Sequence, residues 1–288
     1  MVSVPKTYND LYLEARKRFK AAGISEYNLE ARLILSAAAG KTREEFIRDA
    51  RLYVSSEYEK MVQKLIERRL EGEPVAYITG EWEFYGLPLT ITSGVLIPRS
   101  DSEVLVDTAI ELLRGQGDLR ILDLCAGSGC IGLALARSLP SARVVLADIS
   151  QEALRVCRLN ILKNNLTQRV TCVRADVKET PPMLLGNFDM IVCNPPYIPT
   201  SDIEKLDVSV KNYEPIEALD GGADGLDFYR CLAKVWRRSL KPGGYLAVEC
   251  GIGQAQDVVD IITEGGFMHL KTVNDTQGIE RVVVGRAV

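Results

Sequence analysis

The sequence predicts an α/β protein in which a mostly parallel, doubly wound sheet with an antiparallel edge strand follows a small helical N-terminal domain and a β-hairpin connector. Three observations lead to this prediction. Residues 1–72 show only helical periodicity, residues 73–99 show short β-prone runs, and residues 100–288 alternate strand-like with helix-like segments. Such alternation is typical of parallel βαβ units, whose ligands bind at the carboxyl ends of the strands.

Residues 1–72 are predicted to form a helical domain. Apolar residues recur at helical spacing in three sets that turn or capping signals separate. The sets are Leu11, Ala15 and Phe19; Leu29, Leu33 and Ala37; and Tyr58, Met61, Leu65 and Ile66. Pro74 follows the last set, and proline does not continue a helix, so the domain is expected to end near residue 72.

Residues 73–99 are predicted to form a β-hairpin linker. The β-prone runs are Val75–Ile78 and Leu87–Thr92, and Gly80, Gly86 and Gly94 interrupt the segment. Glycine at such positions supports the tight turns that a hairpin needs.

Residues 100–288 are predicted to form the domain with the sheet. It opens with a helix from about Glu103 to Leu113 and continues with short, continuous apolar runs that are typical of strands covered on both faces. The runs are Ile121–Leu124, Val144–Ala147, Val170–Val173, Met190–Cys193 and Tyr245–Val248. Helical patterns lie between them at Ile131–Leu139, Gln151–Leu162 and Asp227–Leu240. A last β-prone pair, Met268–Val273 and Arg281–Val284, is expected to add the antiparallel edge.

Composition limits the classes of function. The 288 residues include 35 Lys and Arg against 39 Asp and Glu, a net charge of -4, whereas proteins held to phosphate backbones are usually basic. No apolar run approaches the roughly 20 residues that span a bilayer, and the first residues lack a secretory signal pattern. A single histidine, His269, and no C-x-x-C pair among seven cysteines leave little for a metal site. We therefore expect a cytoplasmic protein without bound metal, whose main partner is neither nucleic acid nor membrane.

The first chemical motif is an apolar strand that leads into a glycine turn and then a helix, Ile121–Gly132. Gly127 and Gly129 let the backbone approach a ligand closely, and the helix presents unpaired N–H groups towards it. Asp123, at the end of the strand, would meet an anionic pyrophosphate badly. The ammonium and sulfonium groups of S-adenosylmethionine suit an acidic site, so this molecule is the favoured ligand.

Three further residues fit the rest of that ligand. Asp148, at the end of the second strand, would bind both ribose hydroxyls, Asp176 would reach the adenine amino group, and Val177 would contact the ring. The same segment also has the dinucleotide spacing Gly127-x-Gly129-x-x-Gly132, with Asp148 where an acidic residue would hold a ribose. An NAD-dependent oxidoreductase is therefore an alternative, and a cofactor-free scaffold is another.

The second motif is Asn194-Pro195-Pro196-Tyr197 at the exit of the fourth strand. The nitrogen of a planar amide or aromatic amine is a poor nucleophile, because its lone pair is delocalised. The Asn194 side-chain oxygen and the Pro195 carbonyl can accept both of its hydrogens and turn the lone pair towards a methyl donor. Proline adds rigidity without a competing donor, and Tyr197 can stack on the planar group.

The two motifs together resemble the Rossmann-like methyltransferases that modify planar amino groups. Further segments closely resemble the HemK/PrmC-type release factor glutamine methyltransferases. They are Glu73–Gly80, Glu83–Gly86, Val95–Arg99 with Asp101 and Glu103, Tyr213–Pro215, and Ala218–Tyr229. The resemblance covers nearly the whole chain, and its helical N-terminal part is the least specific.

The resemblance implies a function and a set of site residues. It implies methyl transfer from S-adenosylmethionine, with S-adenosylhomocysteine as product, to the Gly-Gly-Gln glutamine of bacterial peptide chain release factors, which the helical domain would help to dock. It places Asn194–Tyr197 at the substrate glutamine. It also implies that the methionine end of the cofactor is lined by Cys125, Ala126, Gly127, Ser128 and Gly129. A glutamine of a ribosomal protein, or adenine in DNA, is the alternative methyl acceptor.

Overall fold

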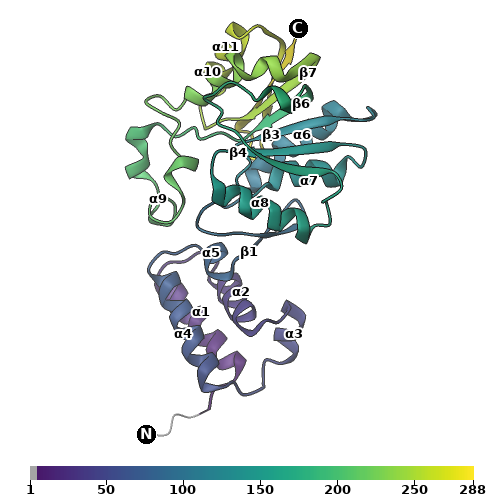
Figure 1. Cartoon of the computed structure of the whole chain (residues 1–288). Coiled ribbons are helices and arrows are strands. Elements are labelled where there is room, and N and C mark those ends of the chain that lie inside the picture. Colours follow the sequence, from purple (N-terminus) through teal and green to yellow (C-terminus); the bar gives the residue numbers. More distant parts are fainter. Residues whose placement is uncertain (1–4) are drawn as a thin grey trace. The chain divides into compact units, whose positions relative to one another are not determined.

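The structure is a computed structural model that describes residues 5–288 (Figure 1). Internal contacts divide the chain into two compact units that meet between Glu81 and Trp82. The first unit is helical, and the second contains the large sheet. Within residues 5–288, no helix is both long enough and apolar enough to cross a membrane.

The first unit is built from short, capped helices. They are α1 (Tyr8–Ala21), α2 (Tyr27–Ala39), α3 (Arg43–Arg48), α4 (Ser56–Leu70) and α5 (Val75–Thr79). Thr7 and Thr42 each form a capping box with the carboxylate three residues later, so the starts of α1 and α3 are encoded locally. α1 packs against α2 and α4, and it buries the three residues that the periodicity predicted, Leu11, Ala15 and Phe19.

The prediction of a strand at Val75–Ile78 is wrong, because this segment is the helix α5. Pro74 precedes its first turn with extended backbone, and Gly80 ends it in the left-handed conformation at φ 73°. The β-branched residues favour a strand locally, but α5 buries Val75, Ala76 and Tyr77 and packs against α2 and α4. Residues 73–81 therefore belong to the helical unit.

The predicted β-hairpin is present, but its first strand lies later in the chain than Val75–Ile78, and nearly all of the hairpin falls within the second unit. Its strands are β1 (Glu81–Phe84) and β2 (Leu87–Thr90). Tyr85 and Gly86 join them with positive φ angles of 51° and 69°, the backbone that a two-residue hairpin turn requires. Asn160 fixes the second strand to the helix behind it, because its side chain accepts from the Thr90 N–H (2.6 Å) and donates to the Thr90 carbonyl (3.0 Å).

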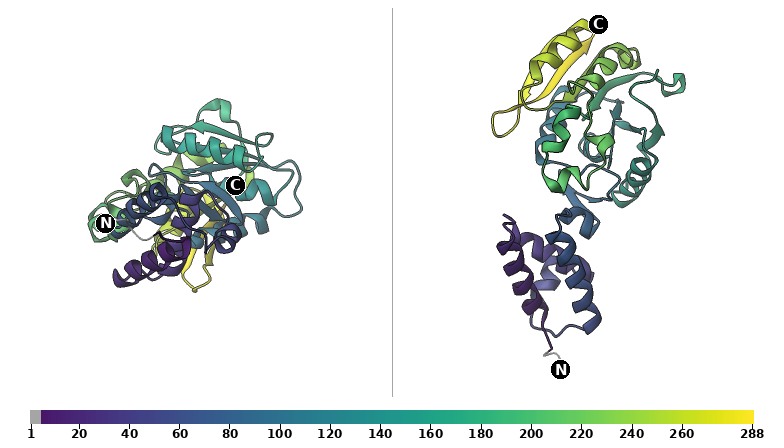
Figure 2. Two further views of the ribbon diagram at one scale, coloured as in Figure 1. Left: turned by 90° about the horizontal axis from the view of Figure 1, so that it is seen from below. Right: turned by 90° about the vertical axis from the view of Figure 1, so that its left-hand side faces the viewer.

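The seven-stranded sheet has the order β5-β4-β3-β6-β7-β9-β8. Its strands are β3 (Arg120–Leu124), β4 (Arg143–Asp148), β5 (Val170–Arg174), β6 (Phe188–Cys193), β7 (Leu240–Glu249), β8 (Phe267–Asn274) and β9 (Glu280–Ala287). The five strands from β5 to β7 are parallel, and β9 is antiparallel to both of its neighbours. The antiparallel strand thus lies one position inside the edge strand β8. Figure 2 shows β8 and β9, in yellow, at the outer end of the sheet next to α11.

Helices cover both faces of this sheet (Figure 1). They are α6 (Glu103–Leu113), α7 (Cys130–Ser138), α8 (Gln151–Lys163), α10 (Asp227–Lys234) and α11 (Ala255–Glu264). On one face, the buried residues of α10 and α11 form a core with alternate residues of the strands, including Leu122 and Leu124 of β3. α6, α7 and α8 pack on the other face. This layering places the carboxyl ends of the parallel strands at one edge, where the loops form the site.

Two helix predictions need correction. The segment Asp227–Leu240 is not one helix, because α10 ends at Lys234 and a 3-10 turn, η5 (Trp236–Ser239), follows. The helix α11 was not predicted at all, although Val258 and Ile262 face the core from it at helical spacing. The other short helical segments are η1 (Ser100–Ser102), η2 (Met183–Leu185), η3 (Thr200–Lys205), α9 (Val208–Lys211) and η4 (Ile216–Ala218).

Candidate active site

The glycine turn lies between β3 and α7, where the sequence predicted it. Cys125, Gly127 and Gly129 all have positive φ angles, of 56°, 55° and 81°. At Gly129 a Cβ atom would come within 2.8 Å of the Leu146 side chain, so only glycine fits there. The Asp148 side chain braces the turn, because its Oδ2 accepts from the Gly127 N–H at 2.9 Å. The result is a rigid turn at the carboxyl edge of the sheet.

Asp123 is a buried carboxylate beside this turn, with 1% of its surface exposed. Its Oδ2 accepts from the Gly132 N–H at 2.8 Å, and its Oδ1 has no hydrogen-bond partner within residues 5–288. Burial raises its pKa to about 7, which the Gly132 hydrogen bond opposes. A buried oxygen without a partner requires a donor, and a cationic donor suits it best. The carboxylate thus fits an ammonium group and would repel a pyrophosphate.

Asp148, Asp176 and Val177 end or follow the next two strands. Both oxygens of Asp148 accept backbone N–H groups, from Gly127 and Ser150 at 2.9 Å each, and burial raises the pKa of Asp148. Each oxygen keeps a second lone pair that a ribose hydroxyl could use. Asp176 is half-buried and accepts from the Lys178 N–H, and Val177 is buried. These contacts shape the turns, and they leave the ligand roles of the three residues as predictions.

The Asn-Pro-Pro-Tyr segment directly follows β6, next to the glycine turn. β3 and β6 are neighbouring parallel strands in which Leu124 pairs with Cys193. Cys125 and Asn194 are the next residues along each strand, so the pairing brings the two sequence motifs side by side. The Asn194 Nδ2 atom donates to the Ser102 hydroxyl at 3.2 Å, which leaves Oδ1 as an acceptor.

The backbone of Tyr197, at the end of this segment, is fixed by contacts with Gln254 and Gly225. Its carbonyl accepts from the Gln254 Nε2 atom at 2.9 Å, and the backbone of Gly225 lies directly against it. A Cβ atom at Gly225 would come within 2.3 Å of the Tyr197 carbonyl oxygen. Burial raises the pKa of Tyr197, so its hydroxyl stays neutral. Asn194 to Tyr197 therefore form a fixed wall.

A cavity of about 100 Å³ opens in front of this wall. It is lined by Leu96, Arg99, Asn194, Pro195, Tyr197, Ile198, Val210, Ala218, Leu219 and Glu249. The lining is mostly apolar with a few polar groups, which suits a small planar group carrying polar hydrogens. Asn194, Pro195 and Tyr197 are site residues that the sequence predicted, and the cavity brings them together.

Sequence reasoning missed part of this site. Arg99 pairs with the buried carboxylate of Glu214, which also accepts from the Ile97 N–H at 3.3 Å. Burial raises the pKa of Glu214, and the Arg99 guanidinium opposes that rise. Both residues lie in segments that the sequence analysis singled out only by resemblance. Glu249 is 2% exposed, whereas its place at a strand end gave no signal of burial.

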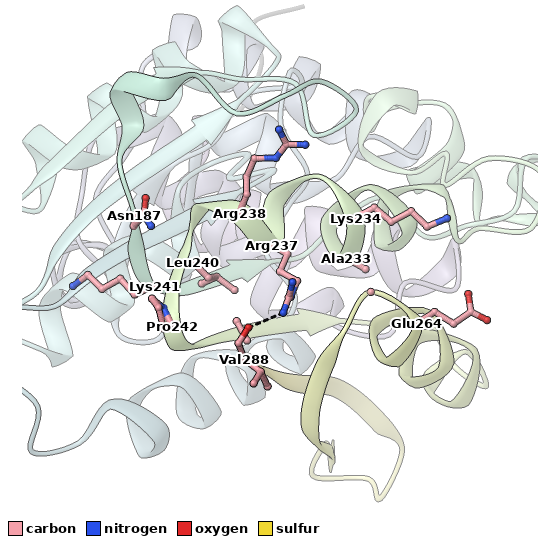
Figure 3. A pocket seen from close by; sticks show the side chains of 12 residues that line it. Asn187, Ala233, Lys234, Arg237, Arg238, Leu240, Lys241, Pro242, Glu264 and Val288 are labelled. Carbon is pink, nitrogen blue, oxygen red and sulfur yellow. Dashed lines mark hydrogen bonds between the residues drawn. The ribbon is translucent and has the colours of Figure 1, made fainter.

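A larger cavity, of about 560 Å³, lies away from these residues (Figure 3). The charged residues of its lining are mostly cationic, since Lys234, Arg237, Arg238 and Lys241 stand against Glu264. Arg237 points towards Val288 and donates to its backbone oxygen at 2.7 Å, while Arg238 points the opposite way. No residue of either sequence motif lines this cavity. Within residues 5–288, no three His, Cys, Asp or Glu side chains are grouped to hold a metal ion.

The class of protein follows from this arrangement. A glycine turn with a buried carboxylate, set beside an Asn-Pro-Pro-Tyr segment at the carboxyl edge of such a sheet, is typical of an S-adenosylmethionine-dependent methyltransferase. The hMettl16 catalytic domain in complex with MAT2A 3′UTR hairpin 6 has the same fold, with a TM-score of 0.57 over 81% of this chain and 83% of that chain at 15% identity.

Sequence comparisons identify the family. The family model "PrmC N-terminal domain" matches residues 10–80, and "Methyltransferase small domain" matches residues 101–209. The release factor glutamine methyltransferase of Geobacter sulfurreducens is 42% identical over 92% of this chain and 91% of its own length. That of Agrobacterium fabrum is 40% identical over 95% of both chains. The chain belongs to the release factor glutamine methyltransferase family.

Proposed function

We propose that this chain transfers a methyl group from S-adenosylmethionine to the side-chain amide nitrogen of the glutamine in the Gly-Gly-Gln motif of bacterial peptide chain release factors. The names of the relatives support the substrate class. The observation that carries the proposal is the strand pairing of Leu124 with Cys193, because it sets the ligand turn next to the Asn194 acceptor.

The residues of the turn fit the cofactor. S-adenosylmethionine supplies an electrophilic methyl group on a positively charged sulfur. The Oδ1 atom of Asp123, which lacks a partner within residues 5–288, would accept from its ammonium group. Asp148 would accept from the ribose hydroxyls, Asp176 would face the adenine amino group, and Val177 would pack on the ring. Cys125 to Gly129 would line the methionine end.

The residues of the small cavity fit the glutamine side chain. Asn194 Oδ1 and the Pro195 carbonyl would each accept one hydrogen of the carboxamide, and the Tyr197 ring would pack on its plane. The nitrogen would then form a bond to the methyl carbon as the carbon–sulfur bond breaks with its electron pair on sulfur, and the nitrogen would lose one proton to water. Orientation and exclusion of water are the contributions of the protein.

The helical unit would help to bind the release factor. Its surface exposes several large apolar side chains, which suits a protein partner. They are Leu13, Leu29, Leu33, Ile47, Leu52, Tyr53 and Met61. Release factors act where proteins are synthesised, so we place the reaction in the cytoplasm.

Tritium transfer from labelled S-adenosylmethionine to a purified release factor tests the proposal. We expect label on the Gly-Gly-Gln glutamine, and a loss of about 100-fold or more in kcat for Asn194→Ala, since one fixed polar contact to a reacting group contributes that much. Asn274→Ala removes an exposed asparagine on β8 and is the matched control. An unlabelled release factor, or full activity of Asn194→Ala, would reject the proposal.

A further inference from the structure

Glu249 is a buried carboxylate at the active site that the reaction outlined above does not use. It ends β7, which is the neighbour of β6, and Val248 pairs with Cys193 in the register of the two strands. Glu249 and Asn194 are the next residues along each strand, and both line the small cavity. The strand pairing thus places this carboxylate directly behind the acceptor amide.

Ser102 interacts with both residues. The Asn194 Nδ2 atom donates to the Ser102 hydroxyl at 3.2 Å, and Ser102 is 2% exposed. The Ser102 hydroxyl and the Asn194 amide both lower the pKa of Glu249, as polar hydrogens near its carboxylate would. The Tyr229 hydroxyl donates to the Glu249 backbone carbonyl at 2.9 Å and fixes the strand end. The three side chains therefore form one cluster, in which Ser102 and Glu249 are buried and Asn194 faces the cavity.

The direction of the Asn194 amide decides whether the site can work. An asparagine side chain carries an acceptor oxygen and a donor nitrogen that a half-turn exchanges. An ionised carboxylate only accepts, so it holds the amino group of Asn194 and leaves Oδ1 to the cavity. We propose that Glu249, together with Ser102, is the positioning residue that directs Oδ1 of Asn194 towards the substrate carboxamide. This inference rests on the proposed function.

The charge of Glu249 gives this arrangement a dependence on pH. Burial raises the pKa of Glu249 to about 7, while the Ser102 hydrogen bond and Arg281 oppose the rise and Asp101 adds to it. A protonated carboxyl group also donates, and it then holds either end of the Asn194 amide. The titratable groups that interact electrostatically with Glu249 are Asp101 of η1, Cys130 of α7, Tyr197 after β6, Tyr229 of α10, Cys250 after β7 and Arg281 of β9.

A purely structural role does not explain this carboxylate. Its Oε2 atom has no hydrogen-bond partner within the part of the chain that the structure describes. A buried polar atom without a partner lowers the stability of a fold. The neutral Glu249→Gln side chain, of the same shape, would remove the buried charge at little cost in packing. Its amide can present either the oxygen or the nitrogen to Asn194, so it no longer fixes the direction.

Steady-state kinetics of the full chain on a purified release factor test the inference. For Glu249→Gln we expect kcat to fall about 10- to 100-fold with an unchanged KM for S-adenosylmethionine, because a hydrogen bond to a charged group contributes about this factor. Ser102→Ala, which keeps the carboxylate, should lower kcat about 3- to 10-fold. Glu264→Gln, at an exposed carboxylate of α11, should match the wild type.

The pH profile separates positioning from structure. The wild-type kcat should fall as the pH falls through about 7, as Glu249 takes up a proton, and Glu249→Gln should lack this limb. Titration of Asp123 would instead appear in the affinity for S-adenosylmethionine and persist in the variant. An unchanged kcat and an unchanged pH profile in Glu249→Gln would overturn this inference alone. An inactive wild type would overturn the proposed function with it.

Discussion

Replacing Asp123 with asparagine separates the contribution of its charge to ligand binding from its contribution to folding. The side chain is buried, Oδ2 accepts from the Gly132 N–H, and Oδ1 has no partner within residues 5–288. Asparagine keeps the shape and can keep the Gly132 hydrogen bond through its oxygen. It places an amino group where the unpartnered oxygen was and removes the negative charge. The variant should therefore stabilise the free protein and weaken its binding of S-adenosylmethionine.

The magnitude follows from the pKa. Burial raises the pKa of Asp123 from 3.8 to about 7, and each pKa unit corresponds to about 1.36 kcal/mol, so ionisation of the folded state costs roughly 4 kcal/mol at about pH 8. The amino group of the asparagine, also without a partner, costs about 1–3 kcal/mol. The free energy of unfolding of the variant should therefore rise by about 1–3 kcal/mol, which corresponds to a rise in Tm of roughly 2–12 °C for a domain of this size.

The sign of the pH dependence is determined by the raised pKa. A carboxyl group with a raised pKa favours the folded state below its unfolded value of 3.8, and this advantage disappears as the pH rises through about 7. The gain in stability of Asp123→Asn over the wild type should therefore be present at about pH 8 and nearly absent at about pH 5. Thermal unfolding at both pH values measures it.

Calorimetric titration with S-adenosylmethionine measures the second effect. Loss of a hydrogen bond between two charged groups should weaken binding by about 10- to 100-fold at about pH 8. Asp118→Asn, at an exposed position just before β3, is the matched control. Equal affinity of Asp123→Asn and wild type, or a change in Tm that is the same at both pH values, would refute the reasoning.

Two further substitutions test the walls of the cavity. Gly225→Ala puts a Cβ atom 2.3 Å from the Tyr197 carbonyl oxygen at a residue with φ +76°, so kcat should fall at least about tenfold while the affinity for the cofactor stays unchanged. Gly253→Ala is the control, because this residue has a similar φ of +81° but open space around it, and the variant should keep an activity close to that of the wild type. Arg99→Met leaves the buried Glu214 carboxylate without its cation and should lower the free energy of unfolding by about 1–3 kcal/mol at about pH 8. Because burial raises the pKa of Glu214, this loss should shrink as the pH is lowered and the carboxylate takes up a proton. A fully active Gly225→Ala would contradict the first prediction. A loss of stability in Arg99→Met that does not depend on pH would contradict the second.

The fold was predictable wherever local signals agreed with packing. The five parallel strands and the helices α6, α7 and α8 lie close to their predicted ranges, because buried apolar runs and helical periodicity are properties of short segments. Val75–Ile78 shows the limit, since a β-branched run became the helix α5 between Pro74 and Gly80. The periodic Leu29 and Leu33 of α2 are exposed, while Ile34 and Leu35 are buried.

The residues of the site also divide into those that the sequence reveals and those that only the structure reveals. Gly129 was recognisable because a positive φ angle favours glycine, and the segment from Asn194 to Tyr197 because its four consecutive residues form a distinctive motif. Ser102 and Glu249 were not, because their roles come from contacts with Asn194 across 92 residues of chain in one case and across a strand pair in the other. Both residue types are also common at strand ends and helix starts, where water normally satisfies them.

The sequence by itself determined the five parallel strands, the helices α6, α7 and α8, the glycine turn and the methyltransferase chemistry that the two motifs share. Each of these depends on the backbone and side chains of a few consecutive residues. Only the tertiary structure decided that β9 inserts between β7 and β8, that Leu124 pairs with Cys193, and that the carboxylates of Asp123 and Glu249 are buried. Strand pairing and removal from water are properties of the assembled sheet, so no single segment contains them.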